Sequence, residues 1–212
     1  MSEANFFVHF QFFGVEPEFL ALKPDEKIFM RQQFLMAFDR FHTQLTMLAY
    51  SLSGTRTDCE MMLVRVTENM ELLNATFDRL REAGIGRYLN PAYTYLTTAE
   101  ERPATLGRAP YLFVCPWGRT KEWYALPQQK KEMRSDQERR IVLAKPSLTL
   151  YTFDSFGMEG QETILACETS QPRDFLSIVK ELKGTPISYY LPMASTFLGT
   201  RKEARDLVES LG

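Results

Sequence analysis

The stretch EMMLVRVTENMELLNATFDRLREAGIGRYLNPAYTYL, residues 60–96, decides the fold, because the chain repeats it as ETILACETSQPRDFLSIVKELKGTPISYYLPMASTFL, residues 162–198. A shift of 102 residues aligns the two copies without a gap, and ten of the aligned positions are identical. Chance alone would give roughly two matches over such a span. Each copy carries a strand pattern, a helix pattern and a second strand pattern, which together form the second half of a split βαβ unit.

The segments outside the repeat complete each half. Residues 6–13 are rich in aromatic side chains and predict a strand, Pro24 begins a helical pattern, and residues 47–52 predict another strand. In the second half we expect strands at residues 111–115, 148–153, 163–167 and 187–191, and helices at residues 128–140, 173–182 and 202–211. The sequence therefore predicts an α+β chain of two tandem ferredoxin-like modules, whose sheets either pack face to face or close into a barrel.

The module boundary is expected in a polar, proline-containing segment. The stretch TTAEERPATLGRAP, residues 97–110, is the best candidate for this segment. We assign residues 1–98 to the N-terminal module, residues 99–110 to a linker and residues 111–212 to the C-terminal module.

Composition and charge exclude several classes of protein. Twenty-five Lys and Arg residues against 27 Asp and Glu residues give a net charge of -2. We therefore expect no overall positive potential that would attract nucleic acid. No apolar run approaches the ~20 residues of a membrane-spanning helix, and the N-terminus lacks the basic start of a signal peptide. The three cysteines, Cys59, Cys115 and Cys167, are far apart in the sequence and fit a reduced, cytoplasmic protein.

Four segments of the sequence resemble the chlorite dismutase and coproheme decarboxylase family. They are YSLSGTRTDCEMMLVRV (50–66), GRYLNPAYTYL (86–96), YLFVCPWGRTKEWYALP (111–127) and SFGMEGQETILACETSQPRDFLSIVKEL (155–182). This resemblance implies a dimeric α+β barrel subunit, a homopentamer, and heme or coproheme bound in the C-terminal half. It also implies a heme-dependent oxidoreductase related to coproheme decarboxylase.

Two positions of the resemblance lack the residue that the family's chemistry uses. The family holds iron through a neutral imidazole on a helix of the C-terminal half, and alignment places Glu138 there. The chain's two histidines, His9 and His42, both lie in the first half. Cys115 stands where decarboxylases of the family use a tyrosine as the radical site, so Cys115 is the candidate catalytic residue there.

Four further positions are candidates for binding the cofactor or for catalysis. Arg119 replaces a lysine that holds a propionate, and Trp123 matches a family turn beside the cavity. Tyr189 replaces a late arginine, and Gln161 matches the distal glutamine of one decarboxylase subgroup. Because chlorite dismutases carry an arginine over the iron instead, chlorite dismutase activity is not expected.

Each candidate also has a structural interpretation. Glu138 fits a solvated helix position, and Cys115 fits an inert thiol in the core. Three functions therefore remain open at this point. The first is a heme- or tetrapyrrole-binding oxidoreductase with a degenerate site. The second is a heme-free family member that acts as a scaffold, a regulator or a subunit of a larger assembly. The third, for which no residue nominates a base, is cofactor-free chemistry in the barrel cavity.

Overall fold

The computed structural model describes residues 6–156, 161–190 and 196–212, and its chain forms two compact units. Unit 1 comprises residues 1–104 and 199–212, and unit 2 comprises residues 105–198. Unit 1 thus includes residues 199–212, which the sequence assigns to the C-terminal module. Among the described residues, no helix is both long and apolar enough to cross a lipid bilayer.

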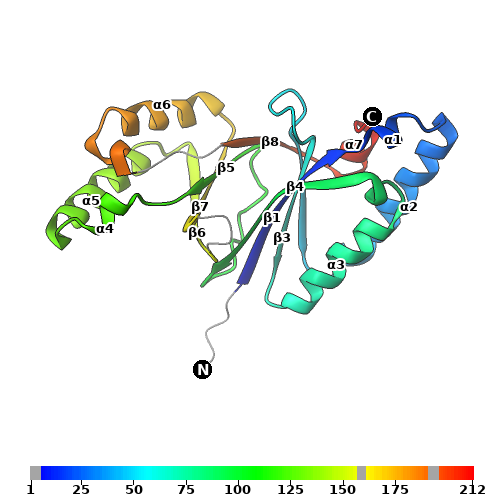
Figure 1. Cartoon of the computed structure of the whole chain (residues 1–212), viewed down its shortest axis with the longest axis horizontal. Coiled ribbons are helices and arrows are strands. Elements are labelled where there is room, and N and C mark those ends of the chain that lie inside the picture. The colour runs from blue at the N-terminus through cyan, green and yellow to red at the C-terminus, as the bar shows by residue number, and fades with distance from the viewer. Residues whose placement is uncertain (1–5, 157–160, 191–195) are drawn as a thin grey trace. The chain divides into compact units, whose positions relative to one another are not determined.

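Unit 1 has the strand order of a ferredoxin-like sheet (Figure 1). Its strands are β1 (Phe6–Val15), β2 (Thr46–Ser51), β3 (Met61–Thr67) and β4 (Leu89–Ala99). β1 is antiparallel to both β3 and β4, and β3 is antiparallel to β2, so the order is β4-β1-β3-β2. The last strand of the chain, β8 (Phe197–Lys202), extends this sheet by pairing with β2.

The helices of unit 1 pack on one face of its sheet. They are α1 (Pro17–Leu20), α2 (Pro24–His42), α3 (Met70–Glu82), α7 (Ala204–Glu209) and the 3₁₀ turn η1 (Gly84–Tyr88). Side chains two residues apart on a strand share a face, so alternate strand residues and the apolar stripes of the helices fill one core. That core includes Phe13, Ala49 and Leu63 from the strands, and Phe34, Phe38, Leu80, Leu207 and Val208 from the helices.

Unit 2 repeats the β1-β3-β2 part of this arrangement with three strands of its own. β5 (Tyr111–Trp117) and β6 (Leu148–Ser155) flank β7 (Thr163–Thr169), and both pair with it in antiparallel register. Two main helices, α5 (Gln128–Leu143) and α6 (Pro172–Lys183), accompany the short α4 (Lys121–Tyr124) and the 3₁₀ turn η2 (Pro186–Tyr190). The ring of Phe113 on β5 stacks on the ring of Phe175 on α6, with centroids 3.9 Å apart. The predicted tandem of ferredoxin-like modules is confirmed.

The prediction of a strand at residues 187–191 is wrong. Residues 186–190 form η2, in which the backbone N–H of Ser188 donates to the carbonyl of Thr185 at 3.2 Å, and Leu191 lies outside the described residues. Pro186 has a fixed φ and no N–H, which suits the first position of a helical turn better than a strand ladder. The final helix spans Ala204–Glu209 rather than residues 202–211, because Lys202 still belongs to β8.

Candidate functional site

Unit 2 contains a small cavity between the end of β5, strand β7 and helix α5. It has a volume of about 140 Å³. Its lining residues are Trp117, Gly118, Arg119, Glu138, Thr152, Glu162, Thr163 and Leu165. The structure thus brings Arg119 and Glu138, two of the six candidate site residues, to one cavity.

An ion pair joins these two candidates inside the cavity. Arg119 Nη2 donates to Glu138 Oε2 at 2.8 Å, and only 21% and 15% of the two side chains are exposed. Because both groups are largely withdrawn from water, removal of either would leave the other charge poorly solvated. Glu138, aligned with the family's iron-ligand position, is therefore already bound to a cation of its own chain.

The pair continues into a stack of aromatic rings and cations. The Arg119 guanidinium lies 4.3 Å from the ring centroid of Trp123, a third candidate. Trp123 packs against Tyr190 with centroids 5.8 Å apart, and the Arg134 guanidinium lies 4.6 Å from the Tyr190 ring. Cations above aromatic faces are attracted by the ring quadrupole. The stack links α4, α5 and η2 and fixes the loop that carries Arg119.

Cys115 lies in the core beside the cavity. It is on the same face of β5 as Trp117 and is buried. Burial raises the pKa of the Cys115 thiol to about 12, so the thiol is protonated at neutral pH, and its sulfur lies 3.7 Å from the Thr196 hydroxyl. A protonated thiol is a poor nucleophile and metal ligand.

Gln161 lies two residues before β7 and is buried, with 5% of its surface exposed. Its Nε2 and the Nη1 of Arg119 are both buried and have no hydrogen-bond partner among the described residues. Buried donors without partners are uncommon in native proteins and indicate a place for a water molecule or a polar ligand group.

Tyr189 is not brought to the cavity, because 81% of its side chain is exposed to solvent. The neighbouring Tyr190 packs on Trp123 instead. Tyr190 is not among the candidates predicted from the sequence, although the repeat aligns it with Tyr88. Tyr88 packs on Phe19 of α1 with ring centroids 5.7 Å apart. In each unit the tyrosine of the 3₁₀ turn thus packs on an aromatic ring of a short helix.

No metal site is evident in the parts of the chain that the structure describes, since no three His, Cys, Asp or Glu side chains come together there. By sequence, residues 105–198 contain no histidine. The described lining of the cavity contains one cation, Arg119, which is already paired with Glu138, and a second carboxylate, Glu162.

Comparisons with known proteins agree with the fold. A model of the family described as chlorite dismutase matches residues 29–202. A coproheme decarboxylase from Mycolicibacterium smegmatis is 24% identical over 176 residues, covering 76% of this chain and 75% of that protein.

Solved structures of chlorite dismutase from Candidatus Nitrospira defluvii superpose on almost the whole chain. The complex with imidazole has a TM-score of 0.86 at 15% identity and covers 100% of this chain and 96% of its own. A double mutant has a TM-score of 0.86 at 16% identity and covers 97% and 95%. The likeness confirms the predicted fold class. With the family model matching most of its residues, the chain belongs to the chlorite dismutase family.

Proposed function

We propose that this chain is a family member that works without a coordinated heme, as a scaffold, a regulator or a subunit of a larger assembly, and that it lacks chlorite dismutase activity. The observation that carries the proposal is the ion pair between Arg119 and Glu138 at 2.8 Å. The sequence resemblance aligns Glu138 with the family's axial imidazole. A carboxylate already bound to an arginine is a poor candidate for an axial ligand of heme iron.

Two further features support a heme-free role. The cavity of about 140 Å³ is well below the ~300–1,000 Å³ of typical small-molecule sites. While the ion pair between Arg119 and Glu138 is intact, this cavity does not fit an iron porphyrin, and its described lining has no imidazole. In addition, the buried thiol of Cys115 is protonated at neutral pH, because burial raises its pKa to about 12, and by alignment it replaces the tyrosine that decarboxylases of the family use as the radical site.

A second function remains a candidate because of the buried Arg119 Nη1 that has no partner among the described residues. If Glu138 moves aside, Arg119 and the Trp123 ring could hold a propionate of a tetrapyrrole without an iron–protein bond. Gln161 Nε2 also lacks a partner among the described residues, and the resemblance aligns Gln161 with the distal glutamine of one decarboxylase subgroup. This function would be weak and atypical tetrapyrrole binding.

Titration of the purified protein with hemin and with coproheme separates the two candidates. We expect no saturable change of the Soret band at micromolar ligand. A saturable change that Arg119→Ala abolishes would instead establish the tetrapyrrole function. With hemin present, we expect no oxygen release from chlorite above the rate of free hemin, and release at enzymatic rates would refute the proposal.

Two matched variants test the role of Glu138. Glu138→His supplies an imidazole and frees Arg119, whereas Glu138→Gln frees Arg119 without an imidazole. We expect only Glu138→His to gain a hemin spectrum typical of imidazole ligation. Equal hemin spectra for the wild-type protein and Glu138→His would mean that position 138 does not decide ligation.

A further inference from the structure

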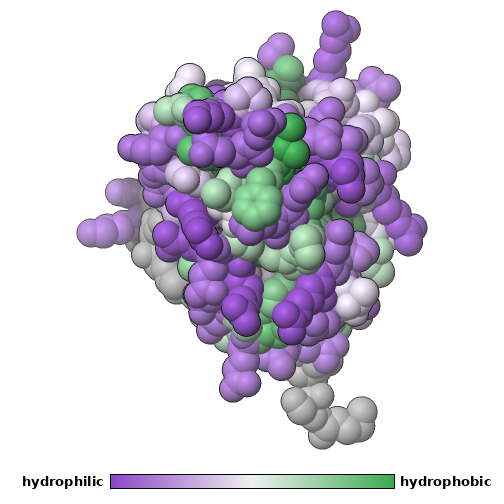
Figure 2. All heavy atoms as spheres, turned by 90° about the vertical axis from the view of Figure 1, so that its right-hand side faces the viewer, coloured by the Kyte–Doolittle hydropathy of each residue, from purple (hydrophilic) through white to green (hydrophobic). Residues whose placement is uncertain are grey.

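Helix α2 of unit 1 presents large apolar side chains to solvent. The exposed fractions of Ile28, Phe29 and Met36 are 51%, 55% and 74%. Figure 2 views the molecule from the side on which α2 lies, and hydrophobic side chains gather there with hydrophilic ones around them. A grouped apolar surface bordered by polar residues is typical of a protein–protein contact.

The exposed face of α2 changes chemical character along its length. Asp25, Phe29, Gln32, Met36 and Arg40 are exposed and follow one another at spacings of three or four residues, so they share one face of the helix. The face therefore runs from an acidic end through an apolar centre to a basic end. Among the described residues, neither Asp25 nor Arg40 takes part in an ion pair.

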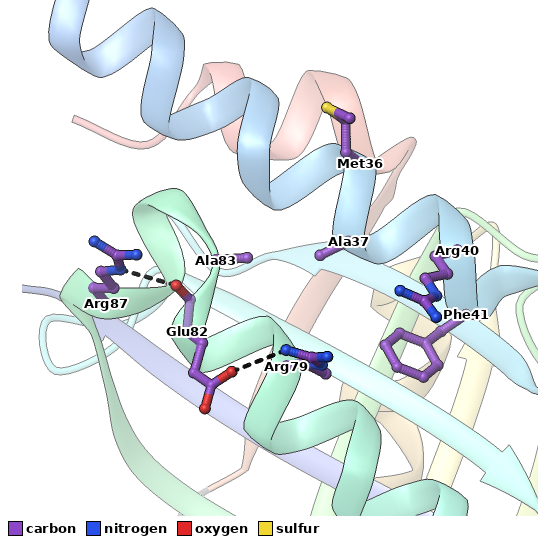
Figure 3. Close-up of a pocket in the computed structure, with 8 residues that line it drawn as sticks. All are labelled: Met36, Ala37, Arg40, Phe41, Arg79, Glu82, Ala83 and Arg87. Atoms are coloured by element: carbon purple, nitrogen blue, oxygen red, sulfur yellow. Dashed lines mark hydrogen bonds and ion pairs between the residues drawn. The ribbon is translucent and has the colours of Figure 1, made fainter.

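The basic end borders a groove between α2 and α3, shown in Figure 3. The groove has a volume of about 540 Å³ and is lined by Met36, Ala37, Arg40, Phe41, Arg79, Glu82, Ala83 and Arg87. Three arginines and one glutamate thus line the groove. Arg79 Nη1 lies 3.4 Å from Glu82 Oε2, and Arg87 Nε donates to the backbone carbonyl of Glu82 at 2.8 Å.

The acidic end is not neutralised by the other cations of α2. Lys27 Nζ donates to the carbonyl of Gly212 at 3.2 Å, and Arg31 Nη2 donates to the carbonyl of Leu211 at 2.6 Å. Both cations are therefore directed toward α7 and the residues after it. Asp39 is next to Arg40 in the sequence, but the three arginines that line the groove still exceed the carboxylates of Asp39 and Glu82 in number.

We propose that two copies of this chain associate through α2 in antiparallel orientation, about a twofold axis near Gln32 and Gln33. Phe29 and Asp25 lie as far before this point as Met36 and Arg40 lie after it. The twofold axis therefore places Phe29 of each copy against the partner's Met36. It also brings Asp25 of each copy to the basic groove of the other. Such an interface is isologous, since the same surface of both copies is complementary to itself.

Sedimentation of the whole protein and of the Met36→Asp variant tests the contact. We expect the wild-type protein to contain an even number of copies, and Met36→Asp to halve that number, because the charge would be buried at the apolar centre. A wild-type monomer at all concentrations overturns the proposal. So does an oligomer of any size, including the pentamer that the family resemblance implies, that Met36→Asp leaves intact.

Charge reversal tests the antiparallel orientation. Asp25→Arg alone and Arg40→Asp alone each place like charges against each other twice per dimer, so we expect dissociation constants about tenfold higher. The double variant restores opposite charges, and we expect its dissociation constant to return toward that of the wild-type protein. Equal weakening by the single and double variants overturns the antiparallel pairing.

A cysteine crosslink tests the position of the axis. The native cysteines Cys59, Cys115 and Cys167 are buried and do not compete. Gln32→Cys lies beside the axis, and we expect it to form a disulfide-linked pair on mild oxidation. Gln44→Cys is the control, because Gln44 is exposed beyond the end of α2 and would lie far from its copy. Equal crosslinking of both variants contradicts the proposal.

Discussion

The two units differ at one pair of facing residues on their central strands. In unit 1, His9 of β1 lies opposite Arg65 of β3. At the equivalent place in unit 2, Phe113 of β5 lies opposite Cys167 of β7. Arg65 is fully buried. It donates to Gln11 Oε1 at 2.6 Å and to the carbonyl of Leu73 at 3.3 Å, and its Nη2 lies 2.8 Å from His9 Nδ1.

Unit 2 fills the same layer between sheet and helix with rings and thiols. Phe113 stacks on Phe175, and burial raises the pKa values of the Cys115 and Cys167 thiols to about 12. A polar layer whose groups are mostly bonded specifies one geometry, whereas an apolar layer tolerates repacking. The two modules thus keep one fold while they stabilise it in different ways, and the following variants test that difference.

The largest effect is expected from Phe113→Ala. Loss of the buried, stacked Phe113 ring should lower the free energy of unfolding by about 4 kcal/mol, because the truncation leaves a cavity that the surrounding core does not fill. Urea unfolding measures the change. Leu176→Ala on the exposed side of α6 is the control, and it should cost less than about 0.5 kcal/mol. A similar cost for both variants would mean that the ring stack adds nothing.

Arg65→Cys should destabilise the protein by about 3 kcal/mol, because it leaves Gln11 and the Leu73 carbonyl without a donor. The triple variant that adds His9→Phe and Gln11→Cys copies the layer of unit 2. We expect urea unfolding to place the triple variant above the single one in stability. If the triple variant is the less stable, the two layers are not interchangeable.

Acid should weaken unit 1 through His9. Burial, with a smaller contribution from the Arg65 charge, lowers the pKa of His9 from 6.5 to about 3. Above about pH 6.5, His9 is neutral in both states. As the pH falls below that value, only the unfolded chain binds the proton, so stability decreases, by about 2 kcal/mol at pH 5.

Urea midpoints at about pH 7.5 and pH 5 measure this decrease, with the triple variant as the reference because it lacks His9. The wild-type protein should lose more stability than the triple variant over this interval. An equal loss in both proteins would show that His9 is protonated in the folded state.

The smallest effect is expected where the two units agree. The Thr67 hydroxyl accepts from the Asn69 N–H at 3.1 Å, and the Thr169 hydroxyl accepts from the Gln171 N–H at 2.8 Å. Thr67→Val and Thr169→Val should therefore each cost about 1 kcal/mol by urea unfolding. Clearly unequal costs would indicate that the repeat preserves this turn for different reasons in the two units.

Much of the fold could be predicted from the sequence because the repeat reflects packing. Leu63 and Leu165, and likewise Leu80 and Leu182, occupy equivalent places in the two cores. The 3₁₀ turn at residues 186–190 could not be predicted from local propensity, since isoleucine and tyrosine favour strands and tertiary contacts override that preference. Its counterpart at residues 84–88 has the same conformation.

The candidate site could be predicted only as a set of positions. Arg119, Trp123 and Glu138 were identified from their alignment with the family. The ion pair between Arg119 and Glu138 spans 19 residues and depends on how α5 crosses the end of β5, which no local pattern encodes. Likewise, the conformation of η2 determines that Tyr190 packs on Trp123 while the neighbouring Tyr189 is exposed to solvent.

The discontinuity of unit 1 has a consequence for synthesis on the ribosome. Leu207, Val208 and Leu211 belong to the core of unit 1, yet they follow all of unit 2 in the chain. The core formed by residues 1–104 is therefore incomplete until residues 105–198 and then residues 199–212 have been translated. Contacts of such large sequence separation form slowly. Unit 2, which is continuous, can be the first to finish folding even though its residues emerge second.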